Sequence, residues 1–97
     1  MEKHIQVIGN MEPYKDSEIT EKSKIRVFES NVDSGELHWH RDREDRIVEV
    51  LDGKNWMLQL DNKLPVEMKI GESYTIPKGV YHRTIKGDGN LKIKINF

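Results

Sequence analysis

Residues 71–82, with the sequence GESYTIPKGVYH, are the segment that decides the fold. Gly71 favours a turn, and residues 73–76 after it predict a short strand. Pro77 fixes its own φ angle and ends a ladder of hydrogen bonds, and Gly79 allows a tight reversal of the chain. We therefore expect His82 to begin a second strand just after this turn.

Apolar and polar residues alternate on both sides of this segment. Every second residue is apolar in four runs, namely residues 25–28, 56–61, 66–70 and 91–97. This period places one side of each strand on a core and the other side in solvent. Because turn-forming Gly, Asn and Asp residues separate the runs, we expect about eight or nine short strands. The fold class predicted is all-β and antiparallel, as a sandwich or a jelly-roll barrel.

The length of 97 residues suits one domain, and we expect residues 1–97 to form it. Residues 35–97 carry the regular pattern and are expected to hold the core. Residues 1–23 are expected to be an N-terminal arm or edge strand, with a loop or single turn at residues 16–22. The apolar residues in the range 5–8 could supply an edge strand to a second copy, which would give a homodimer.

The charge is balanced, with 16 Lys and Arg against 17 Asp and Glu and a formal net charge of −1. This balance excludes the strong basic excess that is typical of proteins that bind nucleic acid or anionic membranes. The absence of cysteine excludes disulfides, thiolate metal sites and a cysteine nucleophile. No apolar run is long enough for a signal peptide or a membrane span, and we expect a cytoplasmic protein.

Two histidines separated by one residue, His38 and His40, form the first candidate site. On a strand, residues two apart point the same way at about 6–7 Å, so both imidazoles can reach one metal ion. Three acids follow at once, namely Asp42, Glu44 and Asp45, and a carboxylate beside neutral imidazoles is a typical set for a divalent metal. Histidines in a charged run are also often merely exposed, and His82 alone is as often a packed core residue as a ligand.

Together the two segments resemble the cupin superfamily. Its second motif has a Gly, then Pro-x-Gly and then a His, which match Gly71, Pro77, Gly79 and His82. Its first motif has His-x-His, an acid three or four residues on and a closing Gly, which match His38, His40, Glu44 and Gly53. The resemblance covers residues 35–97. Gly35 stands closer to the first His than is usual in the family.

The resemblance implies a jelly roll that holds one divalent ion, which could be iron, manganese, zinc, nickel or copper. The ligands that it implies are His38, His40, Glu44 and His82, with Asp45 as the alternative acid. Arg46 stands where the family usually has its acid, seven residues before the closing Gly. If the Arg46 guanidinium faces the pocket, it is an anion-binding group instead, because its fork matches a carboxylate or phosphate. The residues expected to line the substrate pocket are Arg46, Gln59 and Thr84.

Three functions follow as alternatives. The first is a metal-dependent enzyme, of dioxygenase, isomerase or lyase type, that acts on a small polar molecule. The second is a non-catalytic module that binds a small ligand, and the third is a structural or interaction protein with a vestigial site. The first is preferred on the family resemblance, although one fold can host many functions.

Overall fold

The computed structural model describes residues 13–97. In this range the chain forms eight strands and a short 3₁₀ helix. The elements are β1 (Lys15–Ser17), β2 (Ser23–Phe28), η2 (Ser34–Glu36), β3 (Arg46–Lys54), β4 (Met57–Leu60), β5 (Val66–Glu67), β6 (Ser73–Ile76), β7 (His82–Ile85) and β8 (Asp88–Asn96). None of the helical structure in this range is long and apolar enough to cross a membrane.

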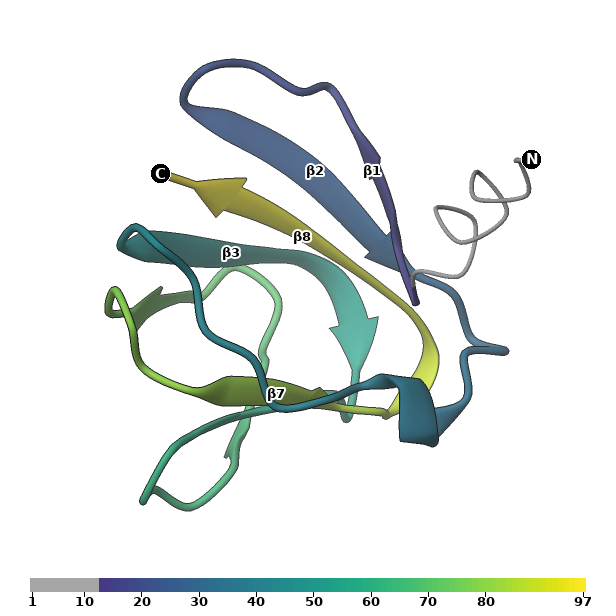
Figure 1. Cartoon of the computed structure of the whole chain (residues 1–97). Helices are drawn as coiled ribbons and strands as arrows, with labels where there is room; N and C mark the ends of the chain where they lie inside the picture. Colours follow the sequence, from purple (N-terminus) through teal and green to yellow (C-terminus); the bar gives the residue numbers. More distant parts are fainter. Residues whose placement is uncertain (1–12) are drawn as a thin grey trace, which may run out of the picture.

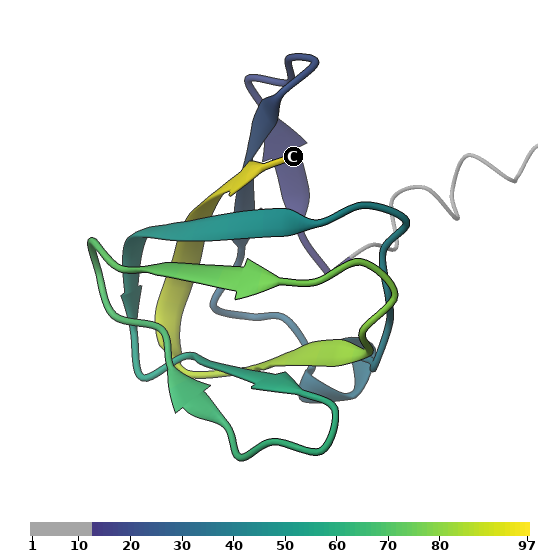
Figure 2. The ribbon, with the colours of Figure 1, turned by 90° about the vertical axis from the view of Figure 1, so that its left-hand side faces the viewer.

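The strands form two antiparallel sheets that face each other (Figures 1 and 2). The order is β1-β2-β8-β3-β6 in the five-stranded sheet and β5-β4-β7 in the three-stranded sheet. The all-β, antiparallel prediction is therefore confirmed. A closed barrel is not seen among the described residues, because no strand pairing joins the two sheets. The register of β3 against β8 shifts after Val50 and again after Asp52, and such bulges bend β3 toward the smaller sheet (Figure 1).

The core lies between the sheets and follows the predicted alternation most closely in β8. Leu91, Ile93 and Ile95 are buried, and the residues between them turn outward. Trp56 is completely buried, and its Nε1–H donates to the Gly89 carbonyl at 3.2 Å. The indole therefore fills apolar space without leaving its polar group unpaired.

Residues 66–70 do not form the alternating strand that the sequence predicted. Strand β5 ends at Glu67, and Ile70 is 60% exposed while Met68 is buried. The Met68 N–H donates to the Trp56 carbonyl at 2.8 Å, and the chain then turns away from β4. Because this turn begins at Ile70, Ile70 pairs with no strand within residues 13–97.

The arm forms a strand where a loop was predicted. Strand β1 pairs with β2, and Asp16 stands directly opposite Arg26. The Arg26 Nε donates to Asp16 Oδ1 at 2.8 Å, and Nη2 donates to Oδ2 at 3.0 Å. The prediction of a loop or single turn at residues 16–22 is wrong for Asp16 and Ser17, which lie in β1, because a cross-strand ion pair rather than an apolar pattern holds this edge. The edge strand expected at residues 5–8 lies outside the described residues.

Low pH should destabilise the pairing of β1 with β2. Partial burial raises the pKa of Asp16, but the hydrogen bonds and charges of Arg26 and Lys24 outweigh it and hold the pKa below its ordinary value. A depressed pKa contributes stability that is complete above the unfolded value of about 3.9 and is lost as pH falls through the folded value. Asp16→Asn should cost about 1 kcal/mol or more at pH 7, and the difference from wild type should shrink below pH 4.

Urea unfolding between pH 7 and pH 2.5 measures this effect. The exposed Asp61 supplies the control, because Asp61→Asn changes the same charge at a site where the carboxylate forms no ion pair with residues 13–97. Parallel stability curves for Asp16→Asn and wild type across this range would contradict the expectation.

Candidate metal centre

Two histidines from distant parts of the chain meet at an isolated antiparallel bridge. The His40 N–H donates to the His82 carbonyl at 2.9 Å, and the His82 N–H donates to the His40 carbonyl at 2.8 Å. Residues paired in this way project their side chains on the same face. The ring centroids are accordingly 4.2 Å apart. The turn that delivers His82 is the predicted one, with Gly79 at φ +76° and a bond of 3.2 Å from Val80 N–H to the Pro77 carbonyl.

Backbone carbonyls fix which nitrogen of each ring carries the proton. Nδ1 of His40 lies 3.1 Å from the His38 carbonyl, and Nδ1 of His82 lies 3.0 Å from the Val80 carbonyl. A carbonyl oxygen only accepts, so Nδ1 is the protonated donor in both rings. Each Nε2 then presents a lone pair, which is the usual preparation of a histidine for metal binding.

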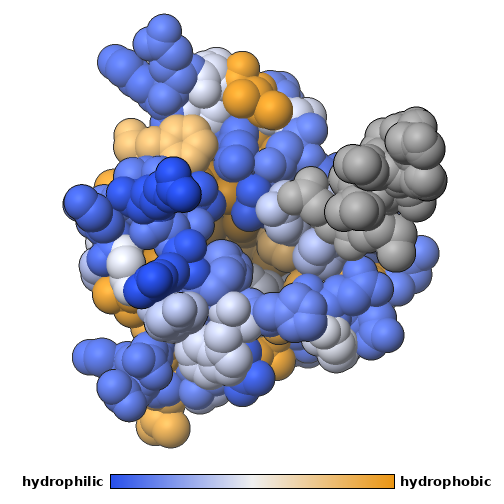
Figure 3. Space-filling model, in the orientation of Figure 1, coloured by the Kyte–Doolittle hydropathy of each residue, from blue (hydrophilic) through white to orange (hydrophobic). Residues whose placement is uncertain are grey.

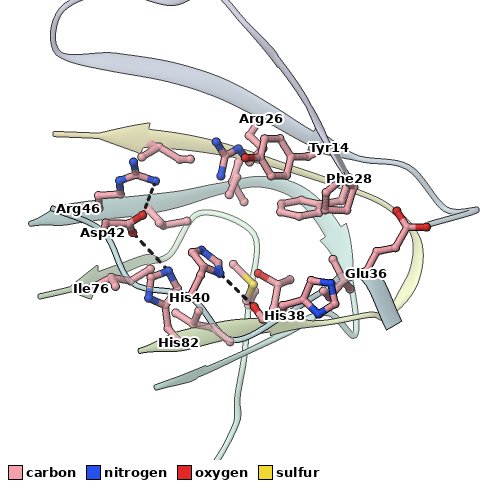
Figure 4. A pocket seen from close by; sticks show the side chains of 18 residues that line it. Tyr14, Arg26, Phe28, Glu36, His38, His40, Asp42, Arg46, Ile76 and His82 are labelled. Atoms are coloured by element: carbon pink, nitrogen blue, oxygen red, sulfur yellow. Dashed lines mark hydrogen bonds and ion pairs between the residues drawn. The ribbon is translucent and has the colours of Figure 1, made fainter. Parts of the chain in front are cut away.

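Asp42 completes the group from the same loop as His40. Its Oδ2 lies 3.4 Å from Nε2 of His82, and its side chain is 11% exposed (Figure 4). Burial of the ring lowers the pKa of His82 and outweighs the Val80 carbonyl and the Asp42 carboxylate, which raise it. The ring is therefore neutral near pH 7, and two lone-pair atoms face each other. Asp42 Oδ2 is a buried polar atom that has no hydrogen-bond partner within residues 13–97.

A divalent cation fits this arrangement. One ligand atom from each of His40, Asp42 and His82 lies within 4.8 Å of the other two. A metal ion bound at about 2.0–2.2 Å to nitrogen and oxygen would satisfy both the orphaned carboxylate oxygen and the two imidazole lone pairs. Two histidines and one carboxylate leave further coordination positions open, as in non-haem Fe(II) and catalytic Zn(II) sites.

The four ligands implied by the motifs are not all brought together. His40 and His82 are in the group, but the His38 ring lies toward Glu36 on the far side of His40 (Figure 4). Helix η2 ends at Glu36, so His38 has no paired strand to place it in step with His40. The short spacing after Gly35 is the sequence signal for this difference. His38 contributes its main-chain carbonyl to His40.

Glu44 also lies outside the group, and Asp42 stands in its place. The Glu44 carboxylate is 44% exposed and accepts from Nε and Nη2 of Arg46 at 3.0 Å each. Asp45 instead accepts from the Lys78 N–H at 2.7 Å. Asp42 is one of the three acids that follow His40 in the sequence, but the spacing of the motif favoured Glu44. Residues 41–45 form no strand, so the strand period could not choose among the three acids.

The Arg46 side chain lines the cavity, but its guanidinium is already paired with two carboxylates, those of Asp42 and Glu44. Its Nη1 lies 3.3 Å from Asp42 Oδ1, and its Nη2 lies 3.0 Å from Glu44 Oε2. The first contact leaves the other oxygen of Asp42, Oδ2, directed at His82. Arg46 therefore positions the carboxylate of the metal group and is less available to an incoming anion than the sequence alone suggested.

A cavity of about 330 Å³ opens beside the three ligands. Its walls between the sheets are mostly apolar and include Val48, Leu58, Met68 and Ile93. Figure 3 shows apolar residues inside a hollow that hydrophilic side chains surround. Of the predicted pocket residues, Arg46 and Thr84 line the cavity. Gln59 does not, because its amide bonds to the Lys63 carbonyl and to Arg83.

Comparison with solved structures shows that the chain has the cupin fold. A cupin-2 domain protein from Shewanella frigidimarina superposes with a TM-score of 0.61 at 19% identity, over 98% of this chain and 91% of that chain. The DMSP lyases RdDddP and RnDddQII give a TM-score of 0.65 at 14% identity, over 75% of this chain. The structure of FeII HppE gives 0.61 at 18% identity, over 77% of this chain.

The two enzymes are much longer than the region they share with this chain. The match covers 35% of the DMSP lyase chain and 41% of the HppE chain. At these identities the likeness establishes the fold alone. No family model and no curated protein sequence matches the chain.

Proposed function

We propose that the protein binds one divalent transition-metal ion through His40, Asp42 and His82 and acts as a metal-dependent enzyme on a small molecule in the adjoining cavity. The observation that carries the proposal is the buried, unpartnered Oδ2 of Asp42, which faces a neutral imidazole nitrogen. An oxygen in this position costs free energy unless a cation or a donor reaches it. The names of the matched enzymes, a DMSP lyase and an iron(II) protein, agree with such a role for the fold.

The donor set is compatible with several divalent transition metals. Imidazole and carboxylate together suit Fe(II), Zn(II) and Mn(II), and also accept Ni(II) and Cu(II). When bound, the ion supplies a Lewis acid with open positions for a substrate oxygen or for water. The residues of this chain hold the two rings in one tautomer, balance the charge of Asp42 through Arg46, and surround the site with an apolar wall. A lyase, isomerase or oxygenase reaction is consistent with these elements.

Metal content tests the proposal directly. Protein purified without an affinity tag should bind about one Zn(II) or, under anaerobic conditions, one Fe(II) per chain. The His40→Ala/His82→Ala variant should bind neither at the same concentration. Urea unfolding shows whether the variant remains folded. Equal, sub-stoichiometric metal in wild type and variant would overturn the proposal.

A further inference from the structure

The cavity contains a second charged group, which is separate from the three metal ligands. Arg26 lines the cavity from β2 in the five-stranded sheet, whereas His82 lies on β7 in the three-stranded sheet. Figure 4 shows Arg26 at one end of the cavity, beside Tyr14, and His82 at the other. Arg26 is 7% exposed. The cavity thus has a guanidinium at one end and the metal group at the other.

The Arg26 guanidinium is held rigidly by the arm. Asp16 binds the edge formed by Nε and Nη2, and the Tyr14 ring stacks on the guanidinium at 3.5 Å from its carbon to the ring centroid. Tyr14 is itself fixed by an edge-to-face contact with Phe28, with centroids 5.5 Å apart. Such support removes the entropy cost of ordering a long side chain when a ligand arrives.

A free edge of Arg26 remains for a ligand. A guanidinium has five N–H donors, and Asp16 occupies two of them. The other edge, formed by Nη1 and the second hydrogen of Nη2, has no partner among residues 13–97. Asp42 Oδ2 is the single buried side-chain polar atom without a partner in that range. Arg26 lines the cavity, and we infer that its remaining donors face that space.

We propose that the substrate is a small organic anion with an apolar body, whose carboxylate or similar oxyanion binds the free edge of Arg26. This rests on the proposed function for its other end, which reaches the metal group. The free edge matches a carboxylate in bidentate geometry. The apolar walls formed by Phe28, Leu58, Met68 and Ile93 accept the body of the molecule. An ion pair needed only to fasten β1 to β2 would not require a donor edge directed into the cavity.

Calorimetric titration with hexanoate, hexanamide and butyrate tests this substrate class. Zn(II)-loaded and metal-free wild-type protein are both titrated. Hexanoate should bind at least about tenfold more tightly than hexanamide, because a hydrogen bond to a charged group is worth more than one between neutral groups. Hexanoate should also bind about tenfold more tightly than butyrate, because it buries two more methylene groups.

The variant Asp16→Asn/Arg26→Gln removes both charges together, so that neither is left buried alone. It should lose the preference for hexanoate over hexanamide and should keep its affinity for Zn(II). Arg83→Gln is the matched control, because Arg83 bonds to Gln59 outside the cavity. If the double variant unfolds, Arg26→Lys keeps the charge without the fork, and the preference should then fall severalfold.

Equal affinity for hexanoate and hexanamide in the wild type would overturn the inference, as would a preference that survives in the Arg26 variants. The titration of metal-free protein separates this inference from the proposed function. A protein that binds no metal but still prefers hexanoate through Arg26 would retain the anion site and refute the metal centre. A protein that binds metal but shows no such preference would retain the metal centre and refute the anion site.

Discussion

Replacement of Asp42 by asparagine should weaken Zn(II) binding by more than about 100-fold. Loss of a residue that only hydrogen-bonds to a metal ligand already lowers metal affinity by about 10- to 100-fold. Asp42 is itself one of the three groups that converge. The neutral amide cannot supply the anionic oxygen now left unpaired beside His82. Competition with a chromophoric chelator measures the Kd of each variant.

Two matched variants let this experiment decide between the ligands implied by the cupin motif and the ligands that converge in the structure. Glu44→Gln removes the acid that the cupin motif implied, but its carboxylate is directed at Arg46. His38→Ala removes the ring that lies away from the pair and leaves the carbonyl that orients His40. Both should change the Kd for Zn(II) by less than about threefold. A large loss in Glu44→Gln, with Asp42→Asn unaffected, would restore the assignment from the motif.

Gly87→Ala should destabilise the fold by about 3 kcal/mol, at the upper end of the range for overpacking. A Cβ atom at Gly87 would lie 2.4 Å from backbone atoms of Lys54, Asn55 and Trp56. Backbone cannot move aside as a flexible side chain can. The connection from β7 to β8 therefore touches the connection from β3 to β4 without any side chain between them. Chemical denaturation followed by the fluorescence of buried Trp56 measures the loss.

Gly35→Ala is the control for this substitution. A Cβ atom at Gly35 would meet only Asp33 Oδ1, at 3.6 Å, which is an ordinary contact. Its stability should stay within about 0.5 kcal/mol of wild type. Equal stability of the Gly87 and Gly35 variants would show that the two connections can separate at little cost.

The sequence predicts the histidines of the site better than it predicts the acid. His82 was predictable because Pro77 and Gly79 set a local turn that ends where β7 begins. The acid was not, since residues 41–45 form no strand and their path depends on distant contacts. The Gly79 N–H bonds to the Asp42 carbonyl at 3.0 Å, and the Lys78 N–H bonds to Asp45. A motif that counts residues along the chain cannot register such contacts.

The sequence by itself determined the antiparallel all-β class and the turn before His82, because side-chain periods and turn preferences act over a few residues. It was the resemblance to cupins that put forward His40 and His82 among the candidate ligands. Only the tertiary structure decided that Asp42 joins the two rings and that Arg26 enters the same cavity. Both side chains are placed by contacts between separate elements of the fold, and the energies of those contacts depend on three-dimensional packing rather than on spacing in the chain.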